Sequence, residues 1–152
     1  MTSTRESRRI AGLLLISIVA IEFGGYYLTR VASGAVELTS FQSAFARAGH
    51  AHAGVLVTLS LIAVVLADAA GARGAAGWIA RLGIPFAAIL MPTGFFLSSM
   101  GAGRTGPNGL VVLLWIGALG LAAGALTLGV LLVRSSLVPG GRADEAVANQ
   151  QS

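Results

Sequence analysis

The amino-acid sequence predicts an all-α membrane protein in which four transmembrane helices form an antiparallel bundle. Hydrophobic residues make up 55% of its 152 residues and charged residues only 11%, and the mean hydropathy is +0.83. Apolar runs of bilayer-spanning length recur along the chain, and they lack the alternation of a lipid-facing barrel strand. Because a helix satisfies its own backbone hydrogen bonds in lipid, we expect these runs to be helical.

The expected transmembrane domain covers residues 1–135, with spans at about residues 10–28, 49–67, 78–100 and 109–133. A helix needs roughly 20 residues to cross about 30 Å of hydrocarbon, and each span approaches or exceeds that length. Residues 136–152 include Pro139-Gly140-Gly141, and the part after these three residues is polar. We expect them to form a disordered cytoplasmic tail.

The first span has an alternative interpretation as the core of a secretory signal peptide. Three arginines precede it, and small residues at positions 32–35 resemble a cleavage site. However, the apolar run is long for a signal core and contains Glu22, which favours a permanent span.

Residues 31–48, before the second span, are more polar. Phe41, Ala44, Phe45 and Ala48 recur at helical spacing, which is typical of a short interfacial helix. The same spacing is equally compatible with a capped extension of the second span.

The third and fourth spans contain residues that disturb or tighten helix packing. Pro85 and Pro92 predict a kink in the third span. Gly117, Gly120 and Gly124 lie on one side of the fourth span, where small residues let another backbone approach closely. The approaching helix would belong to this chain or to a second copy in a homo-oligomer.

The arginines predict the orientation in the membrane. If the N-terminus is cytoplasmic, that side holds Arg5, Arg8, Arg9, Arg73, Arg81, Arg134 and Arg142, and the opposite side holds Arg30, Arg47 and Arg104. This bias predicts a multi-pass plasma-membrane protein with both termini in the cytoplasm. Because the positive charges are spread between spans, the lipid bilayer is the expected partner and nucleic acid is not.

Three ionisable residues within the spans are candidate functional groups, since hydrocarbon makes such groups costly. A rise of about 1.5 Å per residue places Glu22, His50 and His52 at similar depths in the outer leaflet. Glu22 shares a helical stripe with Gly25 and Tyr26, which predicts an inward face and a contact with a histidine. The alternatives are a purely structural polar pair or a glutamate exposed at the interface.

The spacing of the histidines restricts their chemistry. Residues two apart on an α-helix are separated by about 200°, so His50 and His52 should face different neighbours and cannot chelate one ion together. A helix that began only after His52 would remove this constraint and permit a shared metal ion.

The sequence His50-Ala51-His52-Ala53-Gly54-Val55-Leu56 resembles the His-x-His segment in the catalytic subunit of haem-copper oxygen reductases and nitric oxide reductases. In that superfamily the two histidines ligate two haems on opposite faces of one helix. The resemblance implies haem as a cofactor with His50 or His52 as an axial ligand. Arg47 and Arg104 are the candidate contacts to haem propionates. With no other histidine in the chain, one protomer cannot form a complete oxidase site.

The chain as a whole, from about residue 5 to residue 135, resembles small four-span membrane proteins of uncharacterised role from high-GC actinobacteria. Residues 47–56 are the most recognisable stretch. This resemblance implies the fold but no biochemical activity.

Three function classes follow. The first is a haem-binding or redox-associated membrane protein, and the second is a proton-coupled carrier that uses Glu22, His50 and His52. The third is an accessory subunit of a larger membrane complex without a cofactor. Cysteine is absent, which excludes thiolate chemistry, and the sequence lacks a phosphate-binding loop and a serine-nucleophile arrangement. An enzymatic role is therefore not indicated, and no catalytic residue can be assigned.

Overall fold

The computed structural model describes residues 4–137 and confirms the all-α fold with four long helices. They are α1 (Arg5–Ala32), α2 (Ser40–Ala69), α3 (Gly74–Ser98) and α4 (Val112–Ser136), with a short 3-10 helix, η1 (Gly109–Val111), before α4. All four are long and apolar enough to cross a membrane. Of the expected tail, residues 136–152, Ser136 is the last residue of α4, and the positions from 138 onward, including Arg142, lie outside the described residues.

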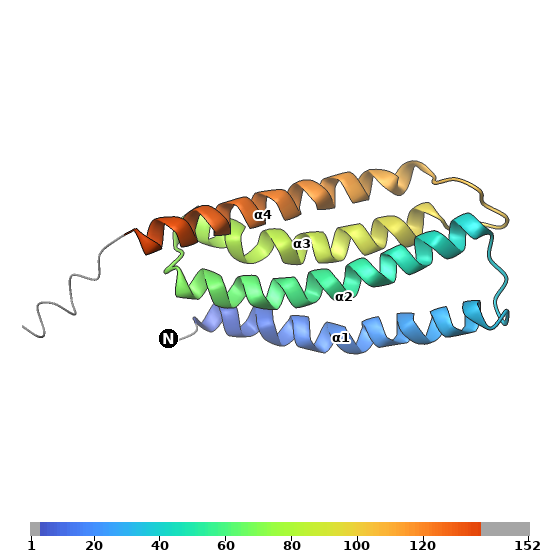
Figure 1. Ribbon diagram of the computed structural model, residues 1–152, viewed down its shortest axis with the longest axis horizontal. Helices are drawn as coiled ribbons and strands as arrows, with labels where there is room; N and C mark the ends of the chain where they lie inside the picture. Colours follow the sequence, from blue (N-terminus) through green and yellow to red (C-terminus); the bar gives the residue numbers. More distant parts are fainter. Residues whose placement is uncertain (1–3, 138–152) are drawn as a thin grey trace, which may run out of the picture.

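Successive helices run antiparallel, and each packs on the next one along the chain (Figure 1). The contacts of α3 with α4 and of α2 with α3 are extensive, whereas α1 packs mainly on α2. Within the described part of the chain, α1 makes no extensive contact with α3 or α4. The bundle is therefore open along the face of α2 that lies between α1 and α3.

Polar side chains set where the first two helices begin. The Thr4 side chain accepts a hydrogen bond from the Ser7 backbone N–H at the start of α1, and Thr39 and Gln42 form a capping box at the start of α2. From Ser40, α2 continues without a break to Ala69. The polar residues before His50 are thus a capped extension of the second span rather than a separate interfacial helix.

The two prolines of α3 lie inside a helix that is continuous from Gly74 to Ser98. Both Pro85 and Pro92 are buried, and the Thr93 hydroxyl donates a hydrogen bond to the Ile89 carbonyl at 2.7 Å. A membrane helix tolerates proline where neighbouring helices pack against it and side chains satisfy nearby carbonyls. Both prolines therefore belong to the packed interior of α3.

Glycines bring the backbones of α3 and α4 into direct contact. A Cβ atom at Gly83 would lie 2.6 Å from the Gly124 Cα and 2.8 Å from the Gly120 carbonyl oxygen. A Cβ atom at Gly117 would lie 2.6 Å from the Met91 Cγ. The predicted glycine packing is confirmed as a contact within one chain, so this face of α4 is already occupied by α3.

We expect Gly124→Leu to lower the free energy of unfolding by about 1–3 kcal/mol, because the added side chain has no room against Gly83 and must separate α3 from α4. The matched control is Gly129→Leu on the same helix, where a Cβ atom would meet nothing within 4 Å. Thermal unfolding of both variants in detergent checks the prediction. Equal stability of the two variants would contradict it.

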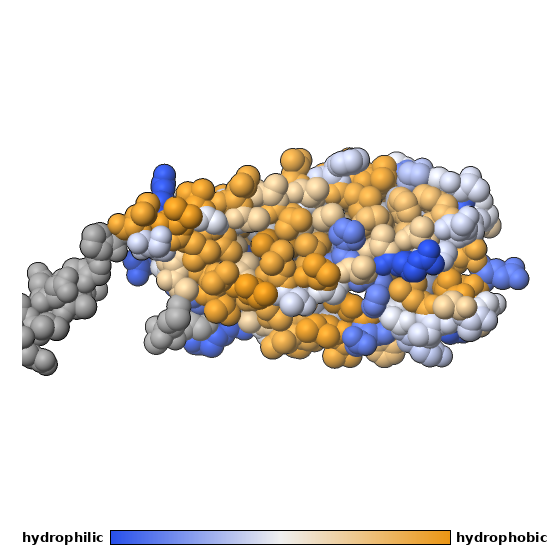
Figure 2. Space-filling model, in the orientation of Figure 1, coloured by the Kyte–Doolittle hydropathy of each residue, from blue (hydrophilic) through white to orange (hydrophobic). Residues whose placement is uncertain are grey.

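The outer surface of the helices is apolar, as a lipid-facing surface should be. Figure 2 shows hydrophobic residues over most of the middle of the visible face, and hydrophilic residues are more frequent towards its ends. Large side chains on α1 are especially exposed, including Ile16 at 71% and Phe23 at 72%. Since water would disfavour such a surface, the structure supports contact between these helices and the lipid bilayer.

Candidate functional site

The two histidines lie on regular turns of α2 and face different neighbouring helices, as their spacing predicts. His50 contacts α1, where Gly24 and Gly25 lie against its ring, whereas His52 contacts Phe95 of α3. Because α2 begins ten residues before His50, the condition for a shared metal ion is not met. Among residues 4–137, no three His, Cys, Asp or Glu side chains are grouped as a metal site requires.

The His50 ring packs closely against a pair of glycines on α1. A Cβ atom at Gly24 would lie 3.2 Å from the His50 Nδ1, and one at Gly25 would lie 3.3 Å from Cε1 and 3.5 Å from Nε2. Neither ring nitrogen of His50 has a hydrogen-bond partner within residues 4–137. Within the described residues, the protein thus engages neither nitrogen of this half-buried ring.

The His52 ring is held by its own helix and by an aromatic neighbour. Its Nδ1 lies 2.8 Å from the Ala48 carbonyl oxygen, which can only accept, so Nδ1–H is the donor and the bond leaves Nε2 unused. The ring centroid lies 4.9 Å from that of Phe95, which in turn contacts Phe45 at 5.4 Å. This tautomer suits a ligating histidine, but aromatic rings pack this side of α2.

Glu22 lies on the surface of α1 rather than in a helix contact. It is exposed and borders a shallow surface hollow with Val19, Phe23 and Tyr26. No hydrogen bond joins Glu22 to either histidine in the described part of the chain. The predicted inward face is therefore wrong: the glycine pair, which allows close approach, forms the face that contacts α2.

The two candidate arginines lie outside the immediate surroundings of the histidine rings. Arg47 is exposed and donates a hydrogen bond to the Ser43 hydroxyl at 2.7 Å, and its position three residues before His50 puts it one turn further out. Arg104 lies in the connection between α3 and η1, where it donates to the Gly106 carbonyl at 3.3 Å. Arg47 is thus the nearer cation along α2.

An apolar groove of about 480 Å³ runs between α1 and α3 across the open face of α2, with His50 in its wall. Its lining extends from Ile10 to Gly24 on α1 and from Leu82 to Phe96 on α3. Among the described residues that line it, Ser17 and His50 are the polar ones and none is Arg, Lys, Asp or Glu. The Ser17 hydroxyl already donates to the Leu14 carbonyl at 2.7 Å, which leaves His50 as the main polar group of the groove.

Comparison with known proteins gives no match for this chain, whether among family models, curated proteins or solved structures. The functional argument therefore rests on the geometry of the groove and of His50.

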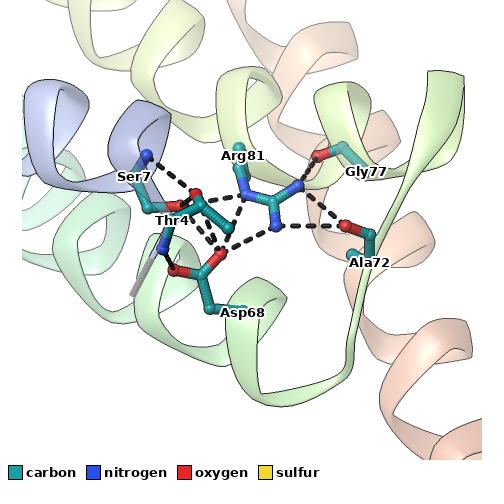
Figure 3. A network of polar contacts seen from close by, with 6 residues as sticks. All are labelled: Thr4, Ser7, Asp68, Ala72, Gly77 and Arg81. Carbon is teal, nitrogen blue, oxygen red and sulfur yellow. Dashed lines mark hydrogen bonds and ion pairs between the residues drawn. The ribbon is translucent and has the colours of Figure 1, made fainter. Parts of the chain in front are cut away.

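A second polar cluster joins α1, α2 and α3 at the opposite end of the bundle (Figure 3). The Arg81 guanidinium donates to the Asp68 carboxylate at 2.7 Å, to the Ser7 hydroxyl at 3.1 Å, and to the carbonyls of Ala72 and Gly77. Ser7 and the backbone N–H of Thr4 also donate to Asp68. With each charged side chain only 10% exposed, the cluster is a satisfied structural clamp.

Sequence reasoning missed both this clamp and the glycine pair beneath His50. The arginine bias treats Arg81 as an exposed cytoplasmic charge, whereas the structure buries it against Asp68. The sequence could have predicted the clamp, because Ser7, Asp68 and Arg81 lie near helix ends that meet on one side of an antiparallel bundle. Likewise, Gly24-Gly25 within an apolar span indicated a close helix contact.

Proposed function

We propose that this chain is a multi-pass plasma-membrane protein that binds a lipophilic ligand through His50 in the outer half of the bilayer. The supporting observation is the His50 ring, which lies in an apolar groove with no hydrogen-bond partner for either nitrogen within residues 4–137. A polar group in such a place is costly unless something pairs with it. An apolar pocket with one convergent polar group is typical of a small-molecule site.

Haem is the redox cofactor that the His-x-His resemblance implies, and His50 is its better-placed axial ligand. Arg47, one turn further out, is the better-placed contact for a propionate. A methionine could supply a second axial ligand, but neither Met91, which packs on Gly117, nor Met100, which is 62% exposed, lines the groove. A haem bound at His50 of a single protomer would therefore have one protein ligand.

The two other function classes have less support from the geometry. Glu22 is exposed and has no hydrogen bond to either histidine within residues 4–137, so no contact joins the three groups of the proposed proton path. The glycine face of α4, which an accessory subunit would offer to a partner helix, already packs on α3. A ligand site at His50 remains the best-supported function, and kinship with the small four-span actinobacterial membrane proteins is part of the proposal.

The test compares the wild-type protein with His50→Ala after purification from membranes in mild detergent. We expect an absorption spectrum, metal analysis and mass spectrometry of an organic extract to detect a ligand that the wild type retains and His50→Ala loses. Equal ligand content in two folded proteins would overturn the proposal. The accessory-subunit hypothesis would then lead.

The proposed orientation, with both termini cytoplasmic, rests on the arginine bias. Burial of Arg81 against Asp68 removes one cation from the exposed cytoplasmic set, but the remaining arginines keep the same bias. We expect reporter fusions after residues 40 and 105 to be external and those after residues 72 and 140 to be cytoplasmic. A cytoplasmic reporter after residue 40 would contradict this orientation.

A further inference from the structure

We infer that the groove binds an isoprenoid quinone or quinol, with its ring beside His50 and its chain along α1 and α3. The inference rests on the proposed ligand site and specifies its ligand. Three features support this inference: the shape of the groove, the residues at its His50 end, and the absence of charged residues from its described lining.

The groove is long and apolar. On α1 its lining residues Ile10 and Gly24 are fourteen positions apart, as are Leu82 and Phe96 on α3, so it extends for roughly 21 Å along the helices. Its volume is about 480 Å³. This shape suits one hydrocarbon chain.

The end of the groove near His50 offers a flat aromatic wall beside a hydrogen-bonding ring. Phe96 lines this end, and its ring packs so closely on α2 that a Cβ atom at the neighbouring Gly49 would lie 3.0 Å from it. Gly24 and Gly25 support the His50 ring from the α1 side. Aromatic rings favour stacked or edge-on contacts with other rings, so this end suits a planar head.

The absence of charged residues from the described lining indicates an uncharged head. A phosphate head would find its cation at Arg47, outside the groove, and haem propionates likewise need a cation or water. A neutral imidazole has one N–H donor and one acceptor nitrogen. The donor pairs with a quinone carbonyl, and the acceptor pairs with the hydroxyl of a quinol. Among long-chain lipids, quinones and quinols combine a planar neutral ring with these groups.

The first test measures quinone in organic extracts of purified protein by chromatography with ultraviolet detection. We expect retained quinone in the wild type and about tenfold less in His50→Ala, since one hydrogen bond in an apolar site is lost. Ala53→Phe, which fills the groove one turn from His50, should have the same effect. The matched control, Ala51→Phe, alters an exposed position on the same helix and should retain quinone.

The second test needs no groove variant. The His52→Asn protein, labelled with ¹⁵N-histidine and placed in phosphatidylcholine nanodiscs, gives ring-nitrogen resonances from His50 alone. Added benzoquinone with a decyl chain should shift these resonances until the shift saturates. Phosphatidylglycerol should not. A His50-dependent haem band, or another His50-dependent lipid, would overturn the quinone inference and preserve the ligand site. No His50-dependent ligand and no shift would overturn both.

Discussion

Arg81→Met is expected to lower the free energy of unfolding by about 3 kcal/mol. Removing one partner of a buried ion pair costs about 3–5 kcal/mol. Because both side chains are still 10% exposed, we expect the cost for this pair at the lower end of that range. The substitution leaves the Asp68 carboxylate without its cation and the Ala72 and Gly77 carbonyls without their donor. Thermal unfolding in detergent measures the loss.

The matched control is Arg73→Met, an exposed arginine just before α3, which should change stability by less than about 0.5 kcal/mol. The double variant Arg81→Met with Asp68→Leu should recover part of the loss, since replacing both buried charges leaves neither unpaired. Equal effects of Arg81→Met and Arg73→Met would show that the clamp contributes nothing.

The clamp should stabilise α1 more than the other helices, because α1 packs mainly on α2 and only 6% of its most apolar stretch is buried. Ser7, on the first turns of α1, is hydrogen-bonded to Arg81 of α3 and to Asp68 of α2. In Arg81→Met, hydrogen exchange should therefore rise at the start of α1 more than in α4. A uniform rise would mean that the whole bundle had loosened.

The number and type of the helices followed from the sequence because crossing hydrocarbon demands long apolar runs. The helix ends did not follow from hydropathy, since polar caps set them: Thr39 and Gln42 start α2 well before its apolar run. The glycine contact of α4 was predictable because small residues on one side of a membrane helix let another helix backbone approach closely. Its partner, Gly83, became evident only from the structure.

The candidate site was only partly predictable. Helical geometry alone separates His50 from His52 by about 200°, and the structure confirms that they face α1 and α3. The prediction that Glu22 faces inward was wrong. Because α1 is exposed on nearly all sides, the residues that recur along one side of it do not distinguish a buried face from a lipid face. The groove depends on how α1 and α3 sit on α2, which no local pattern encodes.

The two histidines should differ in a direct comparison, although their sequence setting is nearly the same. His50→Ala is expected to lower ligand retention about tenfold, whereas His52→Ala should keep the ligand. His52→Ala should lower the free energy of unfolding by about 1–2 kcal/mol through loss of its contact with Phe95 and its hydrogen bond to Ala48. Ligand content per protein and thermal unfolding measure the two effects, and equal ligand loss in both variants would contradict the assignment.

Gly24→Ala tests the same site from the α1 side without removing a histidine. The new Cβ atom would lie 3.2 Å from the His50 Nδ1, so the imidazole must shift and ligand retention should fall by about threefold to tenfold, equivalent to roughly 0.7–1.4 kcal/mol. Gly12→Ala on the same helix meets nothing within 4 Å and should leave retention unchanged. Such a difference between two glycines would mean that the position of the His50 ring, rather than the general packing of α1, determines ligand binding.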